Sequence, residues 1–423
     1  MKTEIVPTAA QLDLARHLRP GDTVIWGQAM AEPVDLIRAL IAEREHLGRI
    51  RIFLGIGGGR LLAPAHADTF ELLAYCGTGS NRELAEAGVL DILPAHYSQL
   101  PRLIRHGPLR ADVVLLQVPP PDSLGRYSLG MAREYLVDAL ITARTIIAEV
   151  HPDVPWTYGG PYLLEGDFDL IVHSTAPLPE AESAPPGSRE KAIGRHVAAF
   201  VEDGATLQAG IGSIPDAVLA QLRDRRELGV HSGSIGNGFA DLHEAGVLTN
   251  SRKTRDPGVG IGGVLIGGEK LRRFAHRNPA LEMRGTDYTH NPRVLGGIDR
   301  FVAINSAIEV DLTGQVNAEV AGGRYVGAVG GISDFLRAAQ AGRGGVPVIA
   351  LPATAGDRSR IVPALSGPVT VTRSDACVIV TEHGAADLRG LTLAQRIPRM
   401  IAIADPAHRE ALERAAHQAL KRG

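Results

Sequence analysis

Short apolar runs alternate with amphipathic helical patterns along the whole chain. Residues 22–29 (DTVIWGQA) predict a strand, and residues 32–45 (EPVDLIRALIAERE) predict an amphipathic helix. The near-continuous apolar run 111–118 (ADVVLLQV) is typical of a strand in a sheet that is buried on both faces. Residues 133–150 predict a helix that leads into a strand. Strands that alternate with helices predict an α/β fold with largely parallel sheets.

The pattern is interrupted once, by residues 176–190 (APLPEAESAPPGSRE), which are rich in Pro, Ala, Ser and Glu. The alternation then restarts with a predicted helix and with a strand, glycine turn and helix over 205–225. At 423 residues the chain is too long for one ordinary core. We therefore expect two domains, over residues 1–182 and 183–423.

The two halves resemble each other locally. Residues 111–130 and 300–319 each run from an apolar strand through Asp, a small residue and Gly into a polar stretch. Asp122 and Gly125 in the first half correspond loosely to Asp311 and Gly314 in the second. Either an internal duplication or chance similarity in turn chemistry explains this weak repeat.

Composition and charge exclude several classes of function. The net charge of −3 gives no basis for binding nucleic acid or an anionic membrane, and no apolar run is long enough to span a bilayer. The first residues are polar and show no secretory signal, so a cytoplasmic location is expected. Cys76 and Cys377 lie far apart, and no histidine has metal-ligand spacing. Neither a disulfide framework nor a metal site is predicted.

Two glycine-rich loops are candidate binding sites. In 208–218 (QAGIGSIPDAV), Gly210 and Gly212 separate a predicted strand from a helix, where bare amides can meet an anion. A tight turn, common in α/β proteins, explains the same pattern. Residues 258–263 (GVGIGG) fit the dinucleotide-binding consensus in form only, because no strand precedes them. A simple dehydrogenase is therefore not predicted.

The loop 326–339 (VGAVGGISDFLRAA) delivers Gly330 and Gly331 to a predicted helix start that contains Asp334. Two convergent backbone amides there can hold a thioester oxyanion, but a glycine turn with a capped helix is an equal explanation. Asn291 precedes Pro292, which favours an extended or turn geometry. An Asx turn and a ligand-binding role remain open for this residue.

Residues 229–238 (GVHSGSIGNG) contain His231, Ser232, Ser234 and four glycines, but no Asp, Glu, Lys or Cys. The serines do not form a nucleophile-elbow motif. The loop either is an active-site loop without its charged residue or has no part in chemistry.

Taken in order, several segments resemble the acetyl-CoA hydrolase/transferase family of class I CoA-transferases. They are "DVVLLQVPPPDSLGRYSLG", "LQAGIGSIPDAV", "LHEAGVLTN", "INSAIEVDLTGQVNAE", "VGGISDF", "SRIVP", "VTVTRSDACVIVTEHGAADLRG" and "MIAIADPAHRE". The resemblance covers nearly the whole chain. It implies two open α/β domains of the class I CoA-transferase type that face each other across a cleft. It also implies acyl-CoA as the small-molecule partner, coenzyme A as a substrate with no permanently bound cofactor, and a homodimer or larger homo-oligomer.

Two positions depart from the family pattern. In active transferases the stretch that matches "GVHSGSI" is similar to Gly-Ile/Val-His-Ser/Thr-Glu-Met, whose glutamate attacks the thioester. Gly233 occupies that position here. The family's Gly-Gly-Gln-x-Asp-Phe motif becomes "GGISDF", with Ile332 in place of glutamine. Gly330 and Gly331 still match the loop associated with the oxyanion hole, and Asn291 matches a segment that contributes to the acyl-CoA site.

Three hypotheses follow from the resemblance. The first is an enzyme on the transferase scaffold that acts on a thioester by hydrolysis, C–C cleavage or non-standard acyl transfer. In this case Gly331 and Gly330 would hold the carbonyl oxygen with help from Asn291, His231 would be the nearest base, and Ser232 would position reactants. The second is an ordinary acyl-CoA:carboxylate CoA-transferase, and the third is a non-catalytic CoA-binding or assembly protein. Gly210, Gly212, Gly330, Gly331 and Asp334 are expected to contact CoA or its acyl group.

Overall fold

The computed structural model describes residues 3–181, 185–375 and 377–420. The chain forms two compact units. Unit 1 comprises Met1–Glu182, Gly233–Asn237 and Ile261–Asn291, and unit 2 comprises Ser183–Ser232, Gly238–Gly260 and Pro292–Gly423. The boundary expected between 182 and 183 lies outside the described residues. The sequence-based division assigned the segments 233–237 and 261–291 to the second domain, whereas their contacts group them with unit 1.

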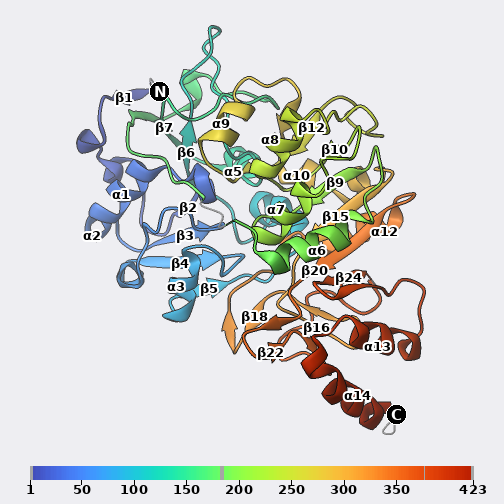
Figure 1. Cartoon of the computed structure of the whole chain (residues 1–423). Helices are drawn as coiled ribbons and strands as arrows, with labels where there is room; N and C mark the ends of the chain where they lie inside the picture. Colours follow the sequence, from blue (N-terminus) through green and yellow to red (C-terminus); the bar gives the residue numbers. More distant parts are fainter. Residues whose placement is uncertain (1–2, 182–184, 376, 421–423) are drawn as a thin grey trace. The chain divides into compact units, whose positions relative to one another are not determined.

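Unit 1 is built on an eight-stranded sheet in which every neighbouring pair is parallel. Figure 1 shows its first strands in blue. Across the sheet the strands are β1 (Glu4–Val6), β8 (Leu170–His173), β7 (Thr145–Val150), β6 (Val113–Val118), β2 (Thr23–Trp26), β3 (Ile50–Leu54), β4 (Phe70–Ala74) and β5 (Leu90–Ile92). The helices of unit 1 are α1 (Val34–Ala42), α2 (Arg44–Leu47), α3 (Asn81–Glu86), α4 (Leu100–His106), α5 (Leu136–Thr142), α9 (Glu269–Ala275) and α10 (Thr286–Thr289).

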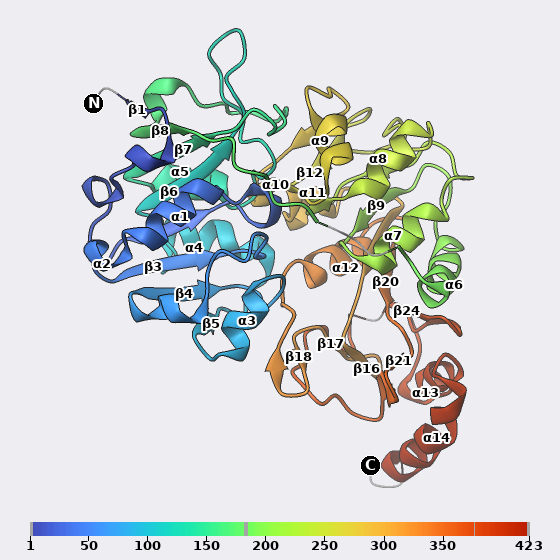
Figure 2. The ribbon, with the colours of Figure 1, turned by 60° about the vertical axis from the view of Figure 1, so that its left-hand side comes forward.

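Alternation along the strands separates the two faces of this sheet. Val24 and Trp26 of β2 face a core cluster that also contains Leu36 and Leu40 of α1, and Figure 2 shows α1 lying across the strands. Tyr135, just before α5, packs edge-on against Phe53 of β3 with ring centroids 5.6 Å apart. Helices therefore cover the sheet on both faces, which explains why its central strands are continuously apolar.

The strand order of unit 1 reverses at β2. From β2 the chain adds β3, β4 and β5 on one side, and then returns to add β6, β7 and β8 on the other. In open parallel sheets, ligands bind outside the carboxyl ends of the strands at this switch point. The residues that follow β2 are therefore candidates for a binding site.

Unit 2 repeats this plan on a smaller sheet, whose order is β10 (Gly229–Val230), β9 (Thr206–Ala209), β15 (Phe301–Asn305), β20 (Val346–Ala350), β24 (Val378–Thr381) and β25 (Gly384–Asp387). All pairs are parallel except β24 with β25. Its helices are α6 (Ser188–Ala198), α7 (Ser213–Ala220), α8 (Asn237–Glu244, which begins in unit 1), α11 (Pro292–Leu295), α12 (Ile332–Ala341), α13 (Leu393–Ala402) and α14 (Pro406–Leu420). The strand order reverses at β9, which lies between β10 and β15.

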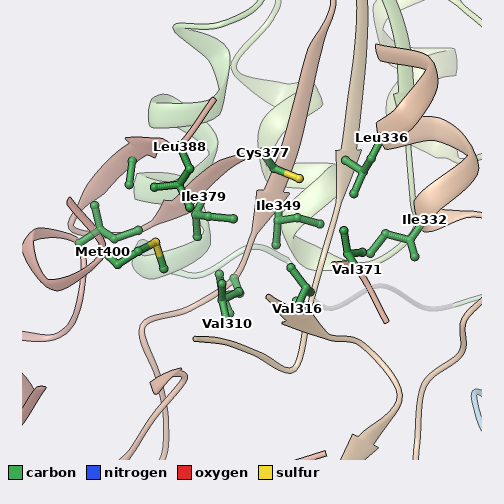
Figure 3. Close-up of a cluster of buried hydrophobic side chains, with 14 of the residues drawn as sticks. Val310, Val316, Ile332, Leu336, Ile349, Val371, Cys377, Ile379, Leu388 and Met400 are labelled. Atoms are coloured by element: carbon green, nitrogen blue, oxygen red, sulfur yellow. The ribbon is translucent and has the colours of Figure 1, made fainter. Parts of the chain in front are cut away.

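Short strands form small accessory sheets. They are β11 (Ser234–Ile235) with β13 (Val264–Leu265), β12 (Gly260–Gly262) with β14 (Leu281–Met283), β16 (Glu309–Asp311) with β17 (Val316–Asn317) and β23 (Ile361–Val362), β18 (Val320–Ala321) with β19 (Arg324–Tyr325), and β21 (Thr354–Ala355) with β22 (Arg358–Ser359). Figure 3 shows the apolar cluster of unit 2, in which Val310 of β16 meets side chains such as Ile349 of β20. The cluster contains Cys377, and burial raises the pKa of its thiol to about 12, so this cysteine is inert.

The two turns suspected of being a repeat have the same hydrogen-bond pattern. The Asp122 carboxylate accepts bonds from two backbone amides, two and four residues further on, and the Gly125 amide donates to its carbonyl. The Asp311 carboxylate accepts bonds from the two equivalent amides, also two and four residues further on, and the Gly314 amide donates to the Asp311 carbonyl. Both glycines have positive φ, of 73° and 93°. The similarity therefore extends from sequence to backbone geometry.

The fold confirms the expected α/β class with a large parallel sheet, while several element boundaries differ. The helix predicted over 32–45 is two helices, α1 and α2, with Glu43 between them. Within residues 300–319, the apolar run 300–310 that was predicted as one strand contributes to two, because β15 belongs to the main sheet of unit 2 and β16 to an accessory sheet. Local apolar pattern could not reveal that the chain changes sheets between them.

Candidate functional site

The switch point of unit 1 gathers polar side chains from four separate segments. Gln28 follows β2, Tyr75 follows β4, Tyr97 follows β5, and Glu134 precedes α5. The Gln28 side-chain amide donates to the Tyr97 hydroxyl at 3.0 Å and to the Glu134 carboxylate. The Tyr75 hydroxyl donates to Gln28 Oε1 at 2.8 Å, and the Tyr97 hydroxyl donates to Glu134 Oε2. We call these four residues the Glu134 cluster.

Glu134 is the only carboxyl group in this cluster, and it is buried, with 2% of its surface exposed. Burial raises its pKa to about 7, although the hydrogen bonds from Tyr97 and Gln28 act in the opposite direction. Both of those donors meet Oε2, and within the described residues Oε1 has no hydrogen-bond partner. The Glu134 backbone also has a φ of 28°, a conformation that non-glycine residues rarely adopt. Such combinations are common at functional sites.

The segment that contains Gly233 borders this cluster within unit 1. The Gly233 carbonyl accepts hydrogen bonds from the amides of Gly263 and Val264, both at 3.0 Å, where β11 begins its pairing with β13. A Cβ placed on Gly263 would lie 2.7 Å from the Gly233 carbonyl oxygen and 3.4 Å from Glu134 Cγ. The Glu134 side chain and the Gly233 backbone therefore flank the same bare backbone position.

His290 packs against the Tyr97 side chain of this cluster. Its ring lies 4.6 Å from the Tyr97 ring, and its Nδ1 lies 2.9 Å from the Thr289 hydroxyl. Burial lowers the His290 pKa to about 3, so the ring is neutral near pH 7. The neighbouring Asn291, a predicted acyl-CoA ligand, belongs to unit 1, and its side-chain amide donates to the Asp287 carbonyl at 3.0 Å.

The switch point of unit 2 has bare backbone where unit 1 has side chains. Gly210 follows β9, and Gly212 is the N-cap of α7 with a φ of 112°. A Cβ built on either glycine would meet no atom within 4 Å. The N-terminus of α7 is therefore open, as an anion-binding helix start must be.

His231 and Ser232 follow β10, the strand next to β9, and both are fully buried. The Ser232 hydroxyl donates to the Ala209 carbonyl at 3.0 Å, and the His231 backbone amide donates to the Leu207 carbonyl at 2.9 Å. The Ser232 hydroxyl is therefore engaged in a structural hydrogen bond between its loop and the last residue of β9.

The loop before α12 matches the prediction that glycines precede a helix start. Gly330 has a φ of 51°, and Gly331 is the N-cap of α12 with a φ of −89°. Asp334 lies in the first turn of the helix and Ile332 is buried. Asp334 therefore adds a negative charge where the helix dipole favours one, which weakens this helix start as a phosphate site.

Sequence reasoning missed Gln28, Tyr75, Tyr97 and Glu134. Glu134 was placed in the helix predicted at the start of residues 133–150, whereas α5 begins at Leu136. Gln28 lay inside the predicted strand 22–29, and no strand was predicted before Tyr75. The feature that marks both residues is their position just beyond β2 and β4 of a parallel sheet, which the structure shows. Within the described residues, no group of three His, Cys, Asp or Glu side chains could hold a metal ion. No helix in the described part of the chain is long and apolar enough to cross a membrane.

Comparison with protein families identifies two matching models. The acetyl-CoA hydrolase/transferase N-terminal domain matches residues 8–166, and the C-terminal domain of the same family matches residues 267–416.

Known proteins point the same way. The chain is 39% identical over 395 residues to a 4-hydroxybutyrate coenzyme A transferase of Clostridium kluyveri, with 92% of each chain covered. It is 28% identical to an acetyl-CoA hydrolase of Yarrowia lipolytica over 62% of this chain and 52% of that protein. The crystal structure of RipA from Yersinia pestis superposes with a TM-score of 0.93 at 31% identity, covering 98% of this chain and 97% of RipA.

Proposed function

Because the chain belongs to the acetyl-CoA hydrolase/transferase family, we propose that it cleaves an acyl-CoA thioester without a carboxylate nucleophile at residue 233. It is an enzyme of this family, and coenzyme A enters as part of the substrate. Hydrolysis is the reaction best supported, because water needs no second binding site. C–C cleavage and acyl transfer to a non-carboxylate acceptor are the other reactions that avoid a glutamyl intermediate.

The observation that carries this proposal is the composition of the loop 229–238. The nearest glutamates along the chain are Glu227 and Glu244. Glu227 precedes β10 and pairs with Arg252 at 3.3 Å, while Glu244 is the exposed last residue of α8. Neither occupies the loop between β10 and α8, so a small shift in alignment does not supply the missing carboxylate.

The remaining predicted residues have proposed roles in binding. The Gly331 amide, next to Gly330, is proposed to stabilise the thioester oxyanion. Gly210 and Gly212 are proposed to meet a CoA phosphate at the open start of α7. Asn291 and Asp334 remain proposed CoA contacts. His231 and Ser232 are retained as reactive candidates only if the buried loop rearranges when substrate binds, because both side chains are buried here.

An ordinary CoA-transferase is the second candidate, favoured by the 39% identity to the 4-hydroxybutyrate coenzyme A transferase. A transferase of that class needs a carboxylate that forms first an anhydride and then an enzyme–CoA thioester. The third candidate is a non-catalytic CoA-binding protein. A homodimer or larger homo-oligomer is proposed for all three.

One experiment separates these candidates. Purified protein is incubated with acetyl-CoA, butyryl-CoA and 4-hydroxybutyryl-CoA, with and without acetate. The free CoA thiol and any new acyl-CoA thioester are then measured. Thiol release that does not require acetate supports hydrolysis. New acyl-CoA that appears only with acetate supports transfer. Binding of CoA by calorimetry without either product supports the third candidate, and no binding at millimolar CoA removes CoA from the account.

A further inference from the structure

The Glu134 cluster contains a buried carboxyl group, one of whose oxygens accepts no hydrogen bond from the described residues. Unit 1 holds two other buried glutamates whose burial raises the pKa to about 7, Glu32 and Glu149. Both oxygens of Glu32 accept backbone amides, of Gly58 at 3.1 Å and Gly59 at 2.6 Å. Glu149 accepts the amides of Asp35 and Leu36 at the start of α1. Among these three glutamates, all in the described part of the chain, Glu134 alone keeps a buried oxygen without a donor.

The position of Glu134 is also different. Glu32 and Glu149 hold backbone amides in place, whereas the partners of Glu134 are the side chains of Gln28 and Tyr97 at the switch point of the sheet. Its Cγ borders the same bare position, at Gly263, as the Gly233 carbonyl. Glu134 is therefore a carboxyl group beside the loop that lacks one.

We propose that Glu134 is the general base and acid of this enzyme, and that its unpartnered Oε1 activates the water that hydrolyses the acyl-CoA thioester. This inference rests on the proposed hydrolysis and assigns the residue that performs it. Gln28 and Tyr97 act as positioning residues, because they hold Oε2 and leave Oε1 available.

The proposed step balances with water as the only co-reactant. The water oxygen attacks the thioester carbonyl carbon while Glu134 Oε1 takes one of its protons. The tetrahedral intermediate then collapses, the C–S bond breaks, and the protonated Glu134 returns that proton to the departing CoA sulfur. The products are the free acid, which loses its own proton to solvent, and CoA thiol. Glu134 ends as the carboxylate with which it began.

The surroundings of Glu134 leave it as the titrating member of the cluster. Burial raises the pKa values of Tyr75, Tyr97 and Tyr135 well above their usual value, so all three stay protonated near pH 7. The His290 pKa is lowered to about 3, which keeps that ring neutral. The Glu134 pKa of about 7 then matches what general acid–base catalysis at neutral pH requires.

Glu32 and Cys76 are two further titratable groups near these tyrosines. Both interact electrostatically with Tyr135, and burial raises both of their pKa values. The Cys76 thiol is therefore protonated near pH 7 and does not compete with Glu134 for the proton.

Glu134→Gln tests the role directly, with Glu149→Gln as the matched control. Both replace a buried glutamate of unit 1 with similarly raised pKa by an isosteric amide. We expect Glu134→Gln to lower kcat for thioester hydrolysis by about 10²–10⁴ with KM and CoA affinity little changed. Glu149→Gln should retain wild-type kcat. Equal loss in both variants, or full activity in Glu134→Gln, would overturn the inference.

Tyr97→Phe provides a second readout if Glu134→Gln fails to fold. The Tyr97 hydroxyl lowers the Glu134 pKa, so its removal should raise that pKa. Because the base acts as a carboxylate, activity rises with pH, with an inflection near pH 7 in the wild type. We expect this inflection to move to higher pH in Tyr97→Phe. An unmoved inflection would assign the titration to another group.

Mass analysis after incubation with acyl-CoA separates this inference from the function on which it rests. No covalent adduct is expected on Glu134. A CoA thioester on Glu134 would make it a nucleophile and overturn the base role, while acyl-CoA cleavage would stand. A wild-type enzyme that binds acyl-CoA and releases no thiol would overturn the proposed hydrolysis and, with it, the inference.

Discussion

The two α/β units share one plan and differ in what they place where the strand order reverses. After β2, unit 1 brings together Gln28, Tyr97 and Glu134, all buried and hydrogen-bonded to one another. After β9, unit 2 places Gly210 and Gly212, whose missing side chains leave open space. Burial raises the pKa of a carboxyl group, and it raises that of Glu134 to about 7. Backbone amides, in contrast, can bind an anion only where no side chain covers them. The difference teaches that one plan can place a buried carboxyl group at the switch point of one unit and bare backbone at that of the other, and we propose proton transfer for the first and ligand binding for the second.

Placing a carboxylate at residue 233 should have the largest effect on activity of the changes considered for the two units. Gly233 is not among the residues with positive φ in the described part of the chain, so its backbone does not oppose a side chain. We expect Gly233→Glu to create CoA transfer from acetyl-CoA or butyryl-CoA to short carboxylates. The gain should be on the order of 10³ over the wild type or more, since deleting a nucleophile from a preorganised site costs about 10⁶.

The measurement for Gly233→Glu is the rate of new acyl-CoA formation, together with a search for the glutamyl-CoA adduct. Gly233→Gln is the matched control, because it adds the same bulk without a nucleophilic carboxylate. A folded Gly233→Glu variant that binds acyl-CoA but forms neither product nor adduct would show that the surroundings have diverged beyond one residue.

Removing a backbone N–H donor from unit 2 tests the proposed stabilisation of the thioester oxyanion by the Gly331 amide. Gly331→Pro deletes one amide N–H, and the φ of −89° at this position is close to what proline adopts. Loss of an oxyanion donor should lower kcat by about 10²–10³. Gly331→Ala keeps the amide and should stay near wild type. Kinetics and melting temperature are measured for both variants, and a folded Gly331→Pro variant with full activity would remove the oxyanion role.

A smaller effect should distinguish a structural glutamate from the proposed catalytic one. The folded state raises the Glu149 pKa from 4.5 to about 7, so the folded protein retains this proton in a pH range where the unfolded chain releases it. The Glu149 contribution to the free energy of unfolding should therefore be greatest below pH 4.5 and fall by roughly 3 kcal/mol as the pH rises to 7. Glu149→Gln cannot ionise and should lose this decline.

Denaturant unfolding of the wild type and Glu149→Gln between pH 4.5 and 7.5 measures that difference. Glu32 and Glu134 shift in the same direction and contribute to both proteins, so only the difference between the two curves reports Glu149. Parallel curves would mean that folding does not raise the Glu149 pKa.

The smallest effect concerns the turns that the units share. Gly125 and Gly314 both have positive φ, so alanine should cost about 1–2 kcal/mol of unfolding free energy at either position. A Cβ at Gly125 meets no atom within 4 Å, whereas one at Gly314 would lie 2.9 Å from the buried Leu388 side chain. Gly314→Ala should therefore be the more destabilising, as measured by denaturant unfolding. A greater loss in Gly125→Ala would contradict the packing difference.

The local features of this protein were predictable from sequence because short-range physics decides them. The apolar run 111–118 predicted β6, and the two glycine-rich loops 208–218 and 326–339 predicted the helix starts that the structure shows as α7 and α12. Element boundaries were less certain, since the single run 300–310 supplies strands to two sheets. Periodicity reports which residues are apolar, but not which sheet they join.

The sequence by itself determined the α/β class, the family resemblance and the absence of a carboxylate from the loop 229–238. Only the tertiary structure decided that Gln28, Tyr97 and Glu134, about a hundred positions apart at the extremes, would share one buried network. The reason is physical: a pKa near 7 arises from desolvation and from specific donors, and both depend on contacts between distant segments. The strand order that brings those segments together leaves no local trace in the pattern of apolar and polar residues.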